Sequence, residues 1–117
     1  MKKNKSLMQS PLEVMICIVN KNKGDETCEI LENNGCYTYF KTKGLGTTAK
    51  SKTGDFFGFG IIEREVFIIL LDNSSIDRIT KILTKELELN KPHTGILLTI
   101  PLSSATSEVL DAFEIKY

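Results

Sequence analysis

The chain has 117 residues, and its 15 Lys and Arg are balanced by 15 Asp and Glu, so the formal net charge is zero. This length favours a single domain with a real core, and the neutral balance argues against a general nucleic-acid-binding protein, which is usually basic overall. The longest apolar runs, residues 14–19 and 66–71, are too short to span a bilayer. Because no signal-peptide core follows the basic N-terminus, we expect a cytoplasmic protein.

Two successive strand–helix–strand units are predicted by the hydrophobic pattern. Gly35 is placed to end the first helix, because glycine enters the left-handed backbone region freely. Ser74 followed by Asp77 resembles the capping box that begins a helix, with Ser75 as the rival cap. We expect strands at residues 12–20, 36–42, 61–71 and 96–100, and helices at residues 24–34 and about 76–89.

The two ends of the chain carry weaker patterns. We predict a flexible N-terminus at residues 1–11, a domain at 12–102 and a C-terminal tail at 103–117. Residues 103–107 are interpreted as a polar link, and the apolar residues after them favour a short helix or strand. We therefore expect one folded unit with loosely organised ends.

The element order βαββαβ is typical of a ferredoxin-like α+β sandwich. In that fold the first and third strands are central, and these are the two strands with uninterrupted apolar runs. Successive side chains of a strand point to opposite faces, so such a run buries both faces of the sheet, whereas two helices cover only one. Large apolar patches are rare on monomers. We infer that subunits pack on the second face; the alternative is that the central loop and the tail fold over it.

A long loop at residues 44–60 separates the two units. The stretch 41–60 contains five of the eight glycines, four lysines and three phenylalanines, and long loops inside compact domains are usually functional or disordered. We predict a mobile output loop at residues 47–58. In this loop Lys50 and Lys52 are the first sites for trypsin, and an aromatic pair docks on a partner or on its own subunit; the pair is Phe56 and Phe57.

Two short motifs resemble PII nitrogen-regulatory signal proteins. Residues 43–46, Lys-Gly-Leu-Gly, are similar to the start of the PII T-loop, and residues 92–102 are similar to the PII B-loop and the strand after it. The resemblance covers about residues 12–105 and implies a homotrimer of ferredoxin-like subunits that is not an enzyme. It also implies that ATP, ADP or AMP binds in clefts between subunits. The T-loop would then dock on a protein target, such as a membrane transporter or an enzyme.

The resemblance places candidate ligand contacts at five residues: Gly44, Gly46, Thr47, Thr48 and Gly95. Several positions differ from the family pattern. Thr47-Thr48 replaces an Arg-Gln pair, Ile96 replaces the B-loop lysine, and His93 replaces its first glycine. The C-terminal arginines are absent from residues 101–108. The expected function is that of a divergent PII-like protein which senses a small anionic ligand.

Other interpretations of the glycine-rich stretch were weighed against this one. Residues 44–49 match the dinucleotide-binding fingerprint, but that motif needs a helix directly after it, which residues 50–60 do not provide. Glycine N–H groups, hydroxyls and lysines can still hold a phosphate; the alternative is a flexible turn with solvated lysines. Residues 58–62, Gly-Phe-Gly-Ile-Ile, resemble the RNP1 motif of RRM domains but lack its basic residue and an aromatic. An RRM-like nucleic-acid-binding module using the sheet face is the alternative function, although no nucleic acid is expected.

No catalytic or metal-binding motif stands out in the sequence. His93, the only histidine, is interpreted as a turn residue, and residues 63–65, Glu-Arg-Glu, as a solvated charge run. Cys17, Cys28 and Cys36 lack the spacing of a metal site or a disulfide framework and are interpreted as structural thiols. We therefore expect neither an enzyme nor a metal cofactor.

Overall fold

The computed structural model of the protein describes residues 7–9, 11–46 and 62–112. The predicted output loop at 47–58 lies outside these ranges. Along the described chain the strands are β1 (Leu7–Gln9), β2 (Leu12–Asn20), β3 (Tyr39–Gly46), β4 (Ile62–Asp72), β5 (Gly95–Pro101) and β6 (Ser104–Thr106). The α-helices are α1 (Gly24–Asn33), α2 (Ile76–Glu86) and α3 (Ser107–Ala112), and one 3-10 turn at Lys21–Lys23 precedes α1.

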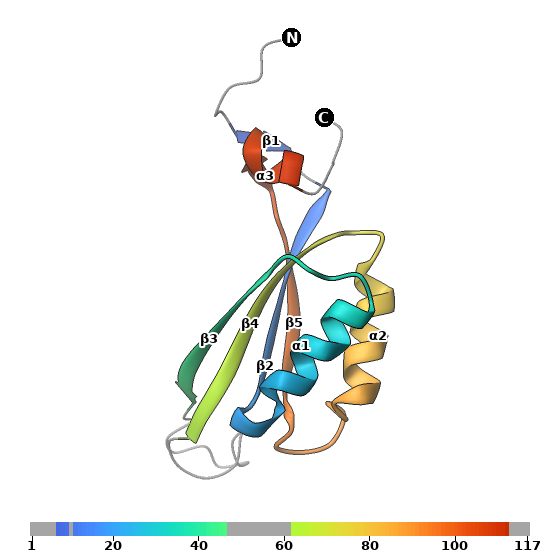
Figure 1. The fold of residues 1–117 in the computed structure, drawn as a ribbon. Coiled ribbons are helices and arrows are strands. Elements are labelled where there is room, and N and C mark those ends of the chain that lie inside the picture. The colour runs from blue at the N-terminus through green and yellow to red at the C-terminus, as the bar shows by residue number, and fades with distance from the viewer. Residues whose placement is uncertain (1–6, 10, 47–61, 113–117) are drawn as a thin grey trace.

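Four strands form one antiparallel sheet in the order β3-β4-β2-β5. Helices α1 and α2 lie together on one face of this sheet (Figure 1). The ferredoxin-like α+β fold is confirmed, and so is the central position of the two most apolar strands, β2 and β4. The more polar β3 lies at an edge, where fewer side chains need to be buried.

The hydrophobic core lies between the sheet and the two helices. Along β2, buried residues alternate with half-buried ones, because the pleat directs every second side chain toward the helices. Met15 pairs with Ile69 and Cys17 pairs with Phe67, and all four are fully buried. The helices complete the core with Leu31 from α1 and with Ile79 and Leu83 from α2.

The opposite face of the sheet, here called the open face, is apolar and carries neither α1 nor α2. One row across all four strands runs Phe40, Ile68, Ile16, Leu98 in register. Phe40 is 68% exposed and Leu98 is 40% exposed. The apolar residues of the open face are Val14, Ile16, Ile18, Phe40, Val66, Ile68, Leu70, Ile96, Leu98 and Ile100, and the same register places Thr42 and Arg64 on this face.

The second predicted strand begins later than expected. We predicted residues 36–42, whereas β3 runs from Tyr39 to Gly46. The cause is the end of α1, where the Cys36 amide donates to the Leu31 carbonyl at 2.8 Å and the Gly35 amide donates to the Glu32 carbonyl at 3.2 Å. This pair of bonds with Gly35 at φ +84° is a Schellman motif. The role predicted for Gly35 is confirmed, and the motif keeps the next residues out of the sheet.

The predicted capping box of the second helix is wrong. Ser75 is the N-cap of α2 but makes no side-chain capping bond. The Ser74 amide donates instead to Oδ1 of Asp72 at 2.9 Å, and the Ser74 hydroxyl donates to the same oxygen. Ser74, which the pattern assigned to the helix cap, therefore bonds to Asp72 at the end of β4 instead. The helix also ends at Glu86, earlier than predicted, and Glu88 adopts a positive φ of 53°.

Both ends of the described chain meet in a small unit, here called the terminal lobe, made of β1, β6 and α3. Strand β1 pairs antiparallel with β6, although these residues were assigned to a flexible N-terminus and a polar link. The lobe lies beyond one end of the main sheet (Figure 1). Its own small core contains Leu12, Leu102, Ala105 and Val109. The division of the chain into a domain and two flanking segments stays a prediction.

Candidate functional site

The candidate ligand residues within the described chain gather at one end of the sheet. Gly44 and Gly46 lie at the end of β3, and Gly95 begins β5. In Figure 1 this is the end opposite the terminal lobe. The other proposed contacts and docking residues lie outside the described ranges: Thr47, Thr48, Lys50, Lys52, Phe56 and Phe57.

Gly44 and Gly95 do not come together within one chain. Gly44 pairs with Arg64 of β4, Arg64 pairs with Asn20 of β2, and β5 lies on the far side of β2. The two glycines therefore occupy opposite edges of the sheet, three strand spacings or about 14 Å apart. A small ligand that touches both kinds of edge needs two different copies of the chain.

The glycines of the first motif belong to a strand rather than to a loop. Strand β3 continues to Gly46, which pairs with Ile62, so residues 44–46 do not form the flexible turn that was the alternative to the anion interpretation. A Cβ added to Gly44 would lie 3.4 Å from Cγ2 of Val66, an ordinary contact. The local backbone therefore does not require glycine at position 44. As an edge strand, β3 leaves alternate backbone N–H groups facing outward.

The segment before β5 is held in one conformation. Gly95 has φ +155°, and a Cβ there would lie 2.5 Å from the carbonyl oxygen of Ile18, so only glycine fits. His93 has a positive φ of 64°, and its carbonyl accepts a hydrogen bond from the Asn20 side chain at 3.3 Å. The Thr94 hydroxyl donates to the Lys91 carbonyl at 2.9 Å. These contacts agree with His93 as a turn residue and give a preorganised loop at the site.

The charged residues beside the site form a linked group rather than a solvated run. Arg64 is 2% exposed and Glu65 is 7% exposed, so the interpretation of residues 63–65 as solvated is wrong. Glu65 is buried because it lies against Gly24 and Lys41. Burial lowers the pKa of Arg64. Glu63 lies 3.7 Å from both Lys21 and Lys43, which ties the start of β4 to the strand and turn beside it.

Glu65 connects β3, β4 and the start of α1. Its carboxylate lies 3.3 Å from the Lys41 ammonium, and this hydrogen bond raises the pKa of Lys41. The same carboxylate lies against the backbone of Gly24, where an added Cβ would come within 1.5 Å of Oε2. A carboxylate at the N-terminus of a helix is stabilised by the helix dipole. Sequence reasoning missed this contact, because Gly24 and Glu65 are distant in the chain and no local motif links them.

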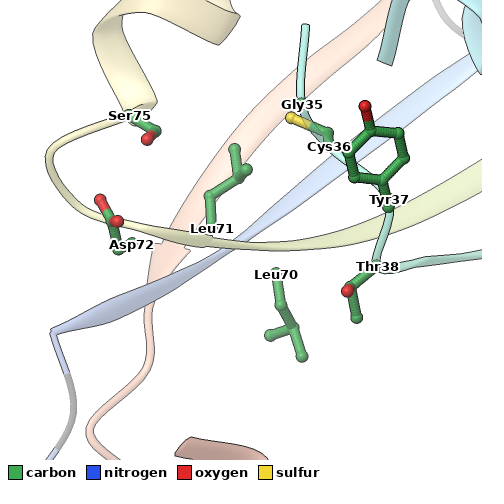
Figure 2. A pocket seen from close by; sticks show the side chains of 8 residues that line it. All are labelled: Gly35, Cys36, Tyr37, Thr38, Leu70, Leu71, Asp72 and Ser75. Atoms are coloured by element: carbon green, nitrogen blue, oxygen red, sulfur yellow. The ribbon is translucent and has the colours of Figure 1, made fainter. Parts of the chain in front are cut away.

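A pocket of about 170 Å³ opens at the other end of β3. Figure 2 shows Cys36, Tyr37 and Thr38 on one side, Asp72 and Ser75 on the other, and two leucines between them. Ligand pockets usually exceed about 300 Å³, so this one is small for an organic ligand. A second and more open hollow lies on the outer surface of α2 and is lined by Thr80, Lys81, Thr84, Lys85 and Asn90.

The thiols show no sign of activation. Cys17 and Cys36 are buried and Cys28 is half-buried. Burial raises the pKa of Cys17 to about 12 and also raises the pKa of Cys36, whereas reactive cysteines have a lowered pKa. Within residues 7–9, 11–46 and 62–112, His, Cys, Asp and Glu side chains form no group of three that could hold a metal ion. In the same ranges no helix has the length and apolar character needed to cross a membrane.

Comparison with known proteins identifies a solved structure with a similar fold. No protein-family model and no curated protein sequence matches the chain. Among solved structures, Arabidopsis thaliana PII bound to citrate superposes with a TM-score of 0.63. The match covers 80% of this chain and 79% of that one, at 11% sequence identity.

The protein has a PII-like fold. The superposition bears out the fold that the motifs at residues 43–46 and 92–102 implied. In this PII-like fold the first motif lies at the end of β3, and the second covers the turn before β5 together with β5 itself. At 11% identity this similarity shows the fold alone.

Proposed function

We propose that the protein is a non-enzymatic, PII-like regulatory protein that senses a small anionic ligand between subunits. The observation that carries this proposal is the placement of Gly44 and the Gly95 loop at opposite edges of the same sheet end. In an assembly, the β3 edge of one copy and the β5 edge of the next can form one cleft. The turn at residues 91–95 and the outward N–H groups of β3 are suited to hold an anion there.

Self-association as a homotrimer is supported by the open face. It carries apolar residues on all four strands, and Phe40, Ile68, Leu98 and Ile100 are all more than a third exposed. A contiguous apolar surface of this kind usually marks an interface. Light scattering coupled to size-exclusion chromatography should give three times the subunit mass. A stable monomer at micromolar concentration would contradict the trimer.

The ligand is proposed to be an adenine nucleotide or another small polyanion. Calorimetric titration with ATP, ADP, AMP, cyclic nucleotides and citrate tests this directly; citrate is included because the PII structure that superposes was solved with it. Gly44→Ala is the matched variant, because alanine fits the strand. We expect it to weaken binding at least about tenfold, which corresponds to about 1.4 kcal/mol, without loss of folding. If a folded trimer binds none of these compounds, the ligand proposal is wrong, and the protein would be a scaffold that binds a protein partner.

Control of a protein target through residues 47–58 stays part of the proposal. Lys50 and Lys52 flank a stretch without apolar periodicity, and Phe56 and Phe57 supply an aromatic anchor. Trypsin should cut first after Lys50 or Lys52, and a bound ligand or partner should slow that cut. If both sites resist trypsin in the free protein, the prediction that residues 47–58 form a mobile loop is wrong. A cytoplasmic location and a transporter or enzyme as the target also stay predictions.

The RRM-like alternative has less support from the described strands. RRM domains stack bases on aromatic side chains of the central strands. On the open face, the described residues of β2 and β4 include no aromatic side chain, and Phe67 is fully buried toward the helices. RNA retention that falls steeply with salt would favour this alternative, particularly if the protein is also a monomer.

A further inference from the structure

The hollow on the outer surface of α2 is a second candidate site that the proposed function does not use. Its volume is about 520 Å³, within the range of about 300–1,000 Å³ of small-molecule sites. It is lined by Thr80, Lys81, Thr84, Lys85 and Asn90. The first four lie on two successive turns of α2, and Asn90 lies in the segment that follows the helix. A single chain therefore builds this site, whereas the cleft proposed at the sheet end needs two copies.

The turn after α2 brings Asn90 back beside the helix. The Leu89 amide donates to the Thr84 carbonyl at 2.9 Å, and the Glu88 amide donates to the Lys85 carbonyl at 3.3 Å. With Glu88 at φ 53°, these bonds form a second Schellman motif, here without glycine. A side chain in the left-handed region is strained and persists where the surrounding structure requires the turn. The chain therefore reverses tightly and adds an amide side chain to the hollow.

The two lysines of the hollow have no carboxylate partner among the described residues. The other lysines in residues 7–9, 11–46 and 62–112 each form an ion pair: Lys21, Lys23, Lys41, Lys43 and Lys91. Glu88, three residues after Lys85, pairs with Lys91. The helix dipole favours a cation in the last turn, where Lys85 lies, but Lys81 lies a turn earlier. Because like charges four residues apart on a helix also repel each other, the hollow carries an uncompensated positive charge.

We propose that this hollow binds the phosphate groups of a small oligophosphate, at a site separate from the cleft at the sheet end. Ammonium groups, threonine hydroxyls and asparagine amides are groups that commonly hold phosphate oxygens. The Cβ atoms of Lys81 and Lys85 lie about 5–6 Å apart on the helix, so the two ammonium groups can neutralise neighbouring phosphates. Thr80 and Thr84 are half-buried beside them, and their hydroxyls can donate to the same oxygens. The described lining residues are all polar and none is acidic, which favours a highly charged ligand.

Calorimetric titration of the full-length protein with inorganic tripolyphosphate tests the proposal. The double variant Lys81→Gln/Lys85→Gln should bind it at least about tenfold more weakly, because both charged donors are lost. Thr84→Val keeps the shape and charge of the hollow and removes one hydroxyl, so it should weaken binding about threefold or more. Lys23→Gln is the matched control, because Lys23 is also partly exposed but pairs with Glu26 and does not line the hollow. It should change the affinity by less than about twofold, since salt screens charges that are not in contact.

Competition distinguishes a free oligophosphate from a nucleotide. Titrations in the Gly44→Ala variant keep binding at the sheet end out of the measurement. ATP carries the same phosphate chain and should displace tripolyphosphate with similar affinity, because none of the described lining residues is aromatic and so none can stack on a base. Orthophosphate should bind at least about tenfold more weakly, because it meets fewer donors. Orthophosphate that binds as tightly as tripolyphosphate would contradict an oligophosphate site.

Four other results would overturn the proposal. The first is a folded, unaltered protein that does not bind tripolyphosphate. The second is an equal loss in Lys23→Gln and in the double variant, which would show general attraction to surface charge. The third is a double variant of lower oligomeric mass, which would show that the hollow contacts a second copy. The fourth is full binding in the double variant with weaker binding in Gly44→Ala, which would move the ligand to the sheet end and leave the proposed function standing.

Failure of the proposed function can be told apart from failure of this inference. A monomeric chain that binds tripolyphosphate, and loses it in the double variant, would contradict the proposed trimer and support the hollow as a separate site. Circular dichroism of each variant shows whether it is folded, and substitutions of exposed lysines seldom change stability by more than a small amount.

Discussion

At the scale of single residues, the contact between Gly24 and Glu65 makes the sharpest prediction. Gly24→Ala pushes the Glu65 carboxylate away from Lys41 and from the start of α1. We expect a loss of roughly 1–2 kcal/mol in the free energy of unfolding, measured by urea denaturation. In a Glu65→Ala background the sign should reverse, because alanine is the better helix former by up to about 1 kcal/mol. Equal losses in both backgrounds would mean that the carboxylate is not involved.

Tyr39 provides a second residue-scale prediction, concerning pH. Hydrogen bonds with Cys28 and Glu32 raise the pKa of Tyr39, and its hydroxyl donates to Glu32 Oε2 at 2.6 Å. Because the pKa is raised in the folded state, this stabilisation is present below the unfolded value of about 10 and is lost as pH rises above it. Absorbance at 295 nm should show a tyrosine component that ionises above the ordinary value of about 10. The late component should be absent in Tyr39→Phe.

At the scale of elements, the two candidate glycines should behave differently. Gly95→Ala places a Cβ against the Ile18 carbonyl at a positive φ, and we expect a loss of about 2–3 kcal/mol in stability. Gly44→Ala meets only an ordinary contact with Val66 and should change stability by less than about 0.5 kcal/mol. Thermal unfolding followed by circular dichroism compares the two. Similar losses at both positions would show that strand β3 also depends on its glycine.

At the scale of the whole molecule, assembly should appear as stability that depends on concentration. The unfolding midpoint of a trimer rises with protein concentration by mass action. Phe40→Thr should reduce this dependence, because it removes a ring from the open face. Tyr37→Thr, which removes a ring that is 74% exposed but lies outside the strands, should leave it unchanged. A midpoint that does not vary with concentration in the unaltered chain would contradict assembly through the open face.

The sequence by itself determined the order of the elements, the central place of β2 and β4, and the end of α1 at Gly35. These features depend on residues close together in the chain: apolar runs, a helical stripe and a glycine that takes a positive φ. The start of β3 could not be predicted, because the Schellman bonds hold the amides of residues 35 and 36 at the end of α1. The capping of α2 could not be predicted, because Asp72 accepts the hydrogen bonds of the Ser74 amide and hydroxyl.

Only the tertiary structure decided how the candidate site is arranged. Gly44 lies in a strand that stays paired as far as Gly46 and Ile62, and this pairing is not encoded in the local motif. Glu65 is buried because Gly24 and Lys41, which are distant from it in the chain, pack against its carboxylate. The pairing of β1 with β6 joins segments almost a whole chain apart. Periodicity reports which face of an element is apolar, whereas the partner of that face depends on contacts between distant residues.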